Sequence, residues 1–154
     1  MAKVDPIPKG YHTVTPSIVV KDGAAAMDFY KRAFGAQESG RMLMPDGKIA
    51  HAEFKLGDST IMLADELDMG ARSPQTLNGV TCSFHVYVQD ADAAFKRAVD
   101  AGATVVAPME DAFWGDRYGL VRDPFGQLWG FATRQREVTE EEMNEAMAKM
   151  TQAK

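Results

Sequence analysis

Residues 114–131 read WGDRYGLVRDPFGQLWGF, and this stretch decides the fold of the 154-residue chain. It predicts a strand over residues 116–122, a turn at Asp123-Pro124-Phe125-Gly126 and a second strand that starts at Gln127. Proline suits the first central position of such a turn and glycine its last position, while Tyr, Leu and Val favour extended backbone. The hairpin becomes specific when it is combined with two strand–helix segments upstream.

Those two segments form an internal repeat. A predicted strand over residues 15–21 leads into a helix from Asp22 that ends at Gly35. The pattern restarts with a strand over residues 80–89, followed by Asp90, which lies 68 residues after Asp22. Both helices contain Lys-Arg-Ala. Two unrelated strand–helix units remain an alternative, but the common order of elements favours a duplicated βαβββ module.

The sequence therefore predicts an α+β fold in which two tandem βαβββ modules form a curved eight-stranded half-barrel cup, followed by a C-terminal helix. Thr139 and Glu142 form a capping box at the start of that helix. The predicted boundaries are an N-terminal arm at 1–13, a first module at 14–66, a connector at 67–79, a second module at 80–135 and the C-terminal helix at 136–154.

Composition excludes several classes of function. The chain carries 17 basic and 22 acidic residues and has no basic cluster, which argues against nucleic acid or an anionic membrane as its partner. The single Cys82 lies in an apolar run and is expected to be a small buried hydrophobe without a disulfide. The N-terminal segment lacks the apolar core of a signal peptide, and no run is long enough to span a bilayer. We expect a soluble cytoplasmic protein.

Side chains alternate between the two faces of a strand, which divides the predicted strands into two sets. One set is apolar and should lie under the helices: Ile18, Val20, Ala50, Ala52, Phe54, Ile61, Leu63, Phe84, Val86, Val88, Trp129 and Phe131. The other set is mixed and predicts the lining of a semi-apolar cavity: Thr15, Ser17, Val19, Ile49, His51, Glu53, Thr60, Met62, Ala64, Ser83, His85, Tyr87, Arg117, Gly119, Val121, Leu128, Gly130 and Ala132.

Three residues of the mixed set are candidates for catalysis. His51 and Glu53 lie two positions apart on one strand, so they are either an acid/base pair, two relocated metal ligands, or a hydrogen-bonded pair that shapes the cavity. His85 on the second module is either a third ligand or a histidine satisfied by its neighbours.

Arg117 either binds an anionic group of a ligand, because its guanidinium suits a planar anion, or pairs with Glu53 across the cavity. We expect Glu53 or Asp116 to hold Arg117 when no ligand is bound. Trp114 and Tyr118 either stack on an aromatic ligand or close a dimer interface. Tyr87 and Ser83 share the predicted cavity, and four methionines offer either an adaptable wall or core filling: Met42, Met44, Met62 and Met69.

The paired modules, the hairpin HAEFKLGDSTIMLAD at residues 51–65 and the segment FWGDRYGLVRDPFGQLWGFAT at 113–133 resemble the vicinal-oxygen-chelate superfamily, and in particular its PhnB-like branch. That superfamily includes glyoxalase I, bleomycin-resistance proteins and extradiol dioxygenases. The resemblance covers about residues 13–135. It implies a curved half-barrel around a small-molecule site, commonly in a homodimer.

The resemblance also implies four metal-ligand positions, one each on the first and last strand of each module. They fall on Thr15, Met62, Ser83 and Gly130, and none of these can serve as the usual His or Glu ligand. We therefore predict no metal at these positions and no cofactor. The function that follows is a metal-independent small-molecule binding protein of the glyoxalase/bleomycin-resistance type, of which drug sequestration is one form.

Two alternatives stay open at this point. The first is a lyase or isomerase of the same superfamily that uses His51, Glu53 or His85, with or without a relocated divalent metal. The second is a protein that acts only through partners and keeps the cup as a vestige.

Overall fold

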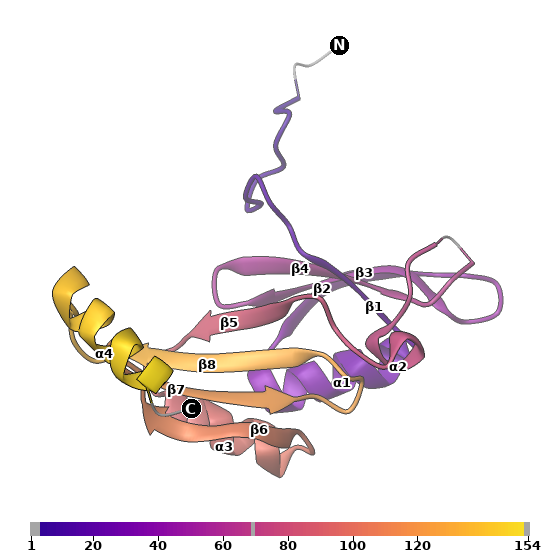
Figure 1. The fold of residues 1–154 in the computed structure, drawn as a ribbon. Helices are drawn as coiled ribbons and strands as arrows, with labels where there is room; N and C mark the ends of the chain where they lie inside the picture. The colour runs from indigo at the N-terminus through magenta and orange to yellow at the C-terminus, as the bar shows by residue number, and fades with distance from the viewer. Residues whose placement is uncertain (1–3, 69, 153–154) are drawn as a thin grey trace. The chain divides into compact units, whose positions relative to one another are not determined.

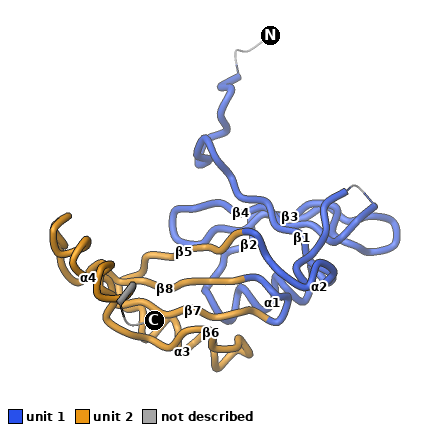
Figure 2. The backbone as a smooth tube through the Cα atoms, in the orientation of Figure 1, with its two compact units in different colours: residues 1–81, 124–127 blue, residues 82–123, 128–154 orange. Residues whose placement is uncertain are grey.

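The computed structural model describes residues 4–68 and 70–152, so Met69 and the ends of the predicted arm and C-terminal helix lie outside the described residues. The chain divides into two compact units (Figure 2). Unit 1 comprises residues 1–81 and 124–127, and unit 2 comprises residues 82–123 and 128–154. Within the described residues, no helix combines the length and apolar character needed to cross a bilayer.

Unit 1 holds a four-stranded sheet with the strand order β1-β4-β3-β2 (Figure 1). Strands β1 and β4 are parallel, and the other neighbours are antiparallel. The elements in chain order are β1 (Ser17–Val20), α1 (Gly23–Phe34), β2 (Gln37–Leu43), β3 (Ile49–Leu56), β4 (Ser59–Asp65) and the short α2 (Pro74–Leu77).

Unit 2 repeats the arrangement with the order β5-β8-β7-β6. Its elements are β5 (Ser83–Tyr87), α3 (Ala91–Asp100), β6 (Thr104–Asp111), β7 (Asp116–Arg122), β8 (Leu128–Arg134) and α4 (Glu140–Gln152). The predicted α+β fold with two βαβββ modules and a C-terminal helix is confirmed, as two separate four-stranded sheets among the described residues.

The two modules match residue by residue. Asp22 caps α1 by accepting a hydrogen bond from the backbone of Ala25, and Asp90 caps α3 in the same way, at 2.9 Å in both cases. Ser17 pairs with Met62 across β1 and β4, and His85 pairs with Gly130 across β5 and β8. Each residue of the second pair lies 68 positions after its counterpart, so the spacing in the sequence is preserved in the strand register.

The core of unit 1 lies between α1 and its sheet. Tyr30, which is fully buried, stacks on Phe54 of β3 with ring centroids 5.3 Å apart. Phe125 from the Asp123–Gly126 turn reaches the same cluster, with its ring 6.1 Å from that of Phe29. In unit 2 the fully buried Trp129 stacks on Phe84. The turn between β7 and β8 thus contributes its aromatic side chain to unit 1.

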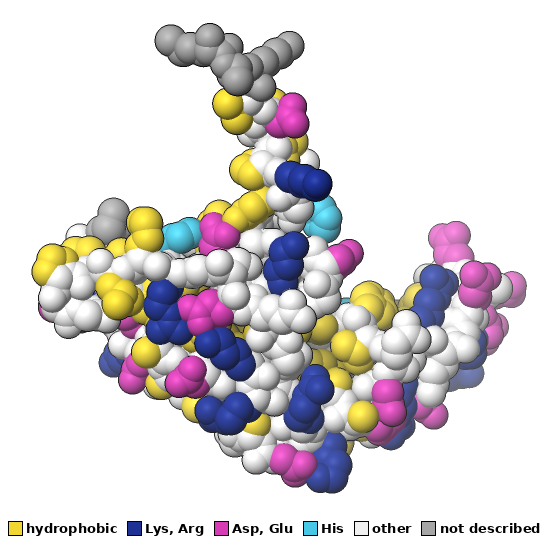
Figure 3. Space-filling model, turned by 180° about the vertical axis from the view of Figure 1, so that it is seen from behind, with side chains coloured by type: hydrophobic (Ala, Val, Ile, Leu, Met, Phe, Trp, Pro, Cys, Tyr) yellow, Lys and Arg dark blue, Asp and Glu magenta, His cyan; other side chains and the backbone are white. Residues whose placement is uncertain are grey.

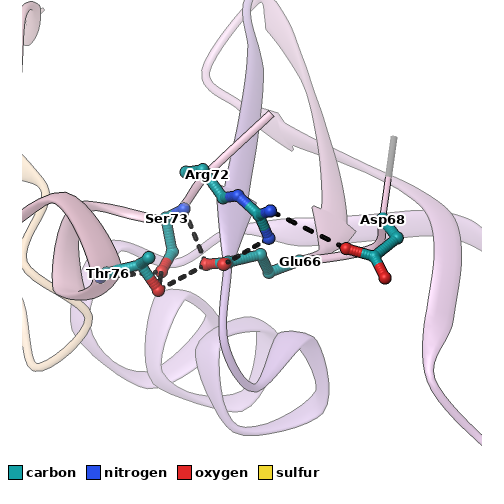
Figure 4. Close-up of polar contacts among 5 residues, drawn as sticks. All are labelled: Glu66, Asp68, Arg72, Ser73 and Thr76. Atoms are coloured by element: carbon teal, nitrogen blue, oxygen red, sulfur yellow. Dashed lines mark hydrogen bonds and ion pairs between the residues drawn. The ribbon is translucent and has the colours of Figure 1, made fainter. Parts of the chain in front are cut away.

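The connector after β4 is fixed by one carboxylate (Figure 4). Glu66 accepts hydrogen bonds from the backbone N–H of Ser73 at 2.9 Å, from Thr76 Oγ1 at 2.8 Å and from Arg72 Nη1 at 3.3 Å. These hydrogen bonds lower the pKa of Glu66 from the ordinary 4.5 to about 2, and the largest effect comes from Ser73, which is also the N-cap of α2. At the other end of the chain, Thr139 and Glu142 form the predicted capping box.

Strand β7 presents the opposite face from the one predicted. Arg122 pairs with Leu128, so the even-numbered residues of β7 share the face of Leu128 and Gly130. A Cβ on Gly119 would come within 2.8 Å of Phe95 on α3, which places the odd-numbered residues under the helix. The prediction that Arg117, Gly119 and Val121 line the cavity is therefore wrong. Five residues connect Arg122 to its partner Leu128. The length of this loop determines which face of β7 is open, and the alternation of side chains along the strand does not reveal it.

Two further expectations are corrected. Ile49 is 1 % exposed and lies beside Gly23 of α1, because a bulge between Ile49 and His51 takes up Ala50 and moves Ile49 to the helix side. Cys82 is exposed rather than buried, since it precedes the first residue of β5.

Candidate functional site

The open face of the unit 1 sheet carries a chain of three polar side chains. The hydroxyl of Tyr11, in the N-terminal arm, donates a hydrogen bond to Glu53 Oε2, although the two residues lie 42 positions apart in the sequence. His51 Nε2 lies 3.0 Å from Glu53 Oε1. The hydrogen bond from Tyr11, followed by that from His51, lowers the pKa of Glu53, while the same carboxylate raises the pKa of Tyr11. The predicted pair His51 and Glu53 is brought together, with Tyr11 as an addition that strand alternation could not reveal.

The N-terminal arm and the open face of the unit 1 sheet line a hollow of about 420 Å³ that is open to solvent. Thr15 and Met62, two of the predicted ligand positions of the superfamily, line it together with Glu53. The remaining lining comes from the arm: Pro6, Ile7, Pro8, Tyr11, His12 and Thr13. Figure 3 shows the hydrophobic side chains of the arm above a surface that carries histidine and acidic side chains at its base. The predicted wall residue Met42 lies on β2 opposite His51 and is 64 % exposed.

The open face of the unit 2 sheet is aromatic. The rings of His85 and Tyr118 stack with an interplanar angle of 10° and centroids 5.3 Å apart. Tyr87 lies 4.8 Å from His85, and Trp114 meets Tyr118 edge-on at 5.4 Å. We call His85, Tyr87, Trp114 and Tyr118 the aromatic platform. All four were predicted site residues, and the structure brings them together.

A buried carboxylate orients two rings of the platform. Asp116 is 3 % exposed, and its Oδ2 accepts hydrogen bonds from Tyr87 Oη and Trp114 Nε1, each at 3.0 Å. The bond to Asp116 raises the pKa of Tyr87. Arg134 joins these three residues around a hollow of about 480 Å³. Sequence reasoning missed Arg134, although it shares the strand parity of Gly130 and lies four residues after it.

Arg117 is not part of the platform. Its Nε and Nη2 donate to the two carboxylate oxygens of Asp92 on α3, each at 2.9 Å, and its Nη1 donates to Asp111 on β6 at 3.3 Å. The expectation that Glu53 or Asp116 holds Arg117 is wrong. The two aspartates raise the pKa of the guanidinium, which joins α3 to β7 on the helix-covered side.

The superfamily's metal positions do not supply metal donors. Thr15 and Met62 offer a hydroxyl and a thioether, and Ser83, at the start of β5, offers a second hydroxyl. Gly130 has no side chain, and the ring of Tyr118 covers it: a Cβ at this position would lie 2.7 Å from Tyr118 Cε2. Among residues 4–68 and 70–152, no three His, Cys, Asp or Glu side chains gather closely enough to hold an ion. This donor set does not fit a divalent metal.

Paired βαβββ modules, each with one helix and a four-stranded sheet, are the fold of the glyoxalase type. Residues 11–131 match the Glyoxalase/Bleomycin resistance protein/Dioxygenase superfamily, and the chain belongs to that superfamily.

Relatives and solved structures agree with this assignment. Protein Mb0911c of Mycobacterium bovis is 46 % identical over 139 residues, which cover 88 % of this chain and 91 % of the relative. The crystal structure of the Arabidopsis thaliana At5g48480 product superposes with a TM-score of 0.65 at 34 % identity, covering 79 % of this chain and 98 % of that one. A PhnB protein of Bacillus cereus shares the fold, with a TM-score of 0.62 at 18 % identity over 79 % of this chain and 99 % of that one.

Proposed function

We propose that this protein binds a small organic molecule on the aromatic platform of unit 2, without a metal ion. The observation that carries the proposal is the buried Asp116, which holds Tyr87 and Trp114 in place beside the stacked His85 and Tyr118. Rings fixed in this way lose little freedom when a ligand stacks on them, and stacking contributes about 0.5–1.5 kcal/mol per aromatic pair.

The ligand that suits this face is a planar aromatic molecule with one anionic group. Arg134 lines the hollow beside the platform, and its side chain is 66 % exposed. Its Nη2 lies 3.9 Å from Oε1 of the exposed Glu137, and the other donors of the guanidinium can bind a ligand carboxylate. Asp116 already accepts hydrogen bonds from two donors, Tyr87 and Trp114. These donors are therefore taken, and the ligand's anionic group binds Arg134 instead. Arg134 thus takes the role that the sequence suggested for Arg117.

The test uses 1-naphthoate and its neutral counterpart 1-naphthalenemethanol, each titrated by calorimetry. Arg134→Met should weaken 1-naphthoate by about two- to fivefold and the alcohol by less, as expected for the loss of a largely exposed charge partner. Arg117→Met is the matched control. It removes a guanidinium that is engaged on the helix-covered side, and it should leave both affinities unchanged.

Nuclear magnetic resonance locates the ligand. The chain has two tryptophans, and their indole N–H groups bond to different carboxylates, Trp114 to Asp116 and Trp129 to Asp123. Binding at the platform should shift the Trp114 indole resonance and leave that of the fully buried Trp129 in place. A ligand that shifts neither resonance, or that binds equally well to Arg134→Met, would contradict the proposal.

An acid/base enzyme, a lyase or isomerase, is the second candidate, and the contact between His51 and Glu53 favours it. The lowered pKa of Glu53 makes this carboxylate a weaker base, which argues for binding over catalysis. To distinguish the two functions, each compound that binds is incubated with the protein in deuterium oxide, and its proton signals are followed by nuclear magnetic resonance. Catalysis predicts exchange or turnover that His51→Ala and Glu53→Gln both abolish and that His85→Ala retains.

The same proposal places the protein in the cytoplasm. The acidic balance of the chain supports the part of it that excludes nucleic acid and anionic membranes as partners.

A further inference from the structure

We propose a second ligand site in unit 1, in the hollow between the N-terminal arm and the open sheet face, which takes a monocationic amine with a compact apolar body. This inference goes beyond the platform of unit 2, because it rests on other residues, another sheet and a ligand of opposite charge.

The walls of the hollow are suited to an apolar body. Pro6, Ile7 and Pro8 of the arm face the sheet side chain Met62 across about 420 Å³. Ile7 is 53 % exposed, so a ligand seated there would cover apolar surface that now meets water. The ring of Tyr11 adds an aromatic surface that attracts cations.

The charge of the hollow selects the polar group. Glu53 is the carboxylate in the lining, which contains no lysine or arginine among its described residues. Hydrogen bonds from Tyr11 and His51 favour the ionised form of Glu53 at neutral pH. Lys55, the neighbouring cation on β3, lies near Gly10 and makes no ion pair with Glu53 in the described chain. The basic side chains at the described lining are therefore His12 on the arm and His51, which lies beside Glu53, and no lysine or arginine takes the place of a ligand ammonium group.

Glu53 also has room for another donor. A carboxylate has about four acceptor positions, and Tyr11 and His51 occupy one on each oxygen. The side chain remains 23 % exposed toward the hollow. An ammonium group can thus donate to Glu53 without displacing Tyr11, so the arm stays in place when the ligand binds.

The test compares cyclohexylmethylammonium with cyclohexylmethanol, which has nearly the same shape and no charge. Calorimetry on the full-length protein should show that the amine binds more tightly. Glu53→Gln keeps the shape of the side chain and should weaken the amine by about tenfold while changing the alcohol by less than about twofold. Glu110→Gln is the matched control, because the side chain of Glu110 is exposed on β6 and makes no hydrogen bond or ion pair within the described residues.

A second variant does not disturb the polar chain. Ile7→Lys places a positive charge in the exposed wall and should weaken the amine several-fold more than the alcohol, because both lose the apolar contact with Ile7 and only the amine is repelled by the added charge. Amide resonances of Tyr11, Glu53 and Met62 should move on titration, while the Trp114 indole resonance should not. Equal affinity for amine and alcohol, or an amine that binds Glu53→Gln and Ile7→Lys as tightly as the unmodified chain, would overturn the proposal. Neither result bears on 1-naphthoate binding at the platform.

Discussion

Tyr118 lies across Gly130, so closely that a Cβ added to Gly130 would come within 2.7 Å of Tyr118 Cε2 and 2.8 Å of its hydroxyl oxygen. Tyr118 comes from β7 and Gly130 from β8, and both belong to the open face of unit 2. A residue with a side chain at 130, such as a metal-binding His or Glu, would occupy the place of this ring. The absence of a side chain at Gly130 thus leaves the space in which the ring of Tyr118 stacks on His85.

The first prediction concerns this pair. Gly130→Ala should push the ring of Tyr118 away from His85 and weaken 1-naphthoate by about three- to tenfold, the equivalent of one aromatic contact. The melting temperature should change little, because the end of a tyrosine side chain can move. Calorimetry and thermal denaturation of the same sample check both statements. An unchanged affinity would show that Tyr118 does not take part in binding.

The second prediction tests the equivalence of the two modules. Asp22→Ala and Asp90→Ala each remove one N-cap hydrogen bond and should each lower the free energy of unfolding by about 1 kcal/mol. Urea denaturation measures both, with Asp5→Ala in the arm as a control that removes the same charge without a cap. A cost confined to one module would contradict equal capping.

The third prediction concerns pH and the connector. The pKa of Glu66 is lowered to about 2 by its partners in the folded chain, so its stabilising effect is fully present above about pH 4.5 and is lost as the pH falls through 2. Glu66→Gln should therefore lower the melting temperature at pH 7, and the difference from the unmodified chain should shrink between pH 4.5 and 2. Glu110→Gln should show no such trend, and a difference that stays constant with pH would exclude the ionised form as the cause.

The fourth prediction concerns metal content. The donors at Thr15, Met62, Ser83 and Gly130 do not suit a divalent ion. Protein purified without chelator or affinity tag should contain well under one divalent metal per chain by elemental analysis. Stoichiometric zinc, nickel or iron that disappears in His51→Ala would instead support the enzyme alternative with a relocated metal.

The fifth prediction is that the protein forms a homodimer. Large apolar side chains are exposed on α4, where Met147 and Met150 are 51 % and 58 % exposed, and on β6, where Val105 and Val106 are 45 % and 46 % exposed. A second copy that covers such side chains removes them from water. Light scattering should give about twice the chain mass of 16.9 kDa. A monomer at micromolar concentration would contradict this prediction.

The sequence by itself determined the features that depend on local interactions. Asp22 and Asp90 identify the starts of two helices, because an aspartate side chain satisfies free amides of the first helical turn. Gly35 ends α1 in the left-handed conformation, with φ of 71°, which glycine adopts without strain. The constant spacing of these signals predicted the duplicated module. The strand register keeps that spacing, since Ser17 pairs with Met62 and His85 with Gly130.

Only the tertiary structure decided which side chains share a face and a site. Alternation separates the two sides of one strand but does not say which side meets the helix, and β7 has apolar residues on both, Leu120 and Val121 among them. The five-residue loop before β8 fixed the pairing of Arg122 with Leu128, so Arg117 lies under α3 and Arg134 lines the platform hollow. Tyr11 reaches Glu53 across 42 residues because the path of the arm brings them together, and no local pattern encodes such a path.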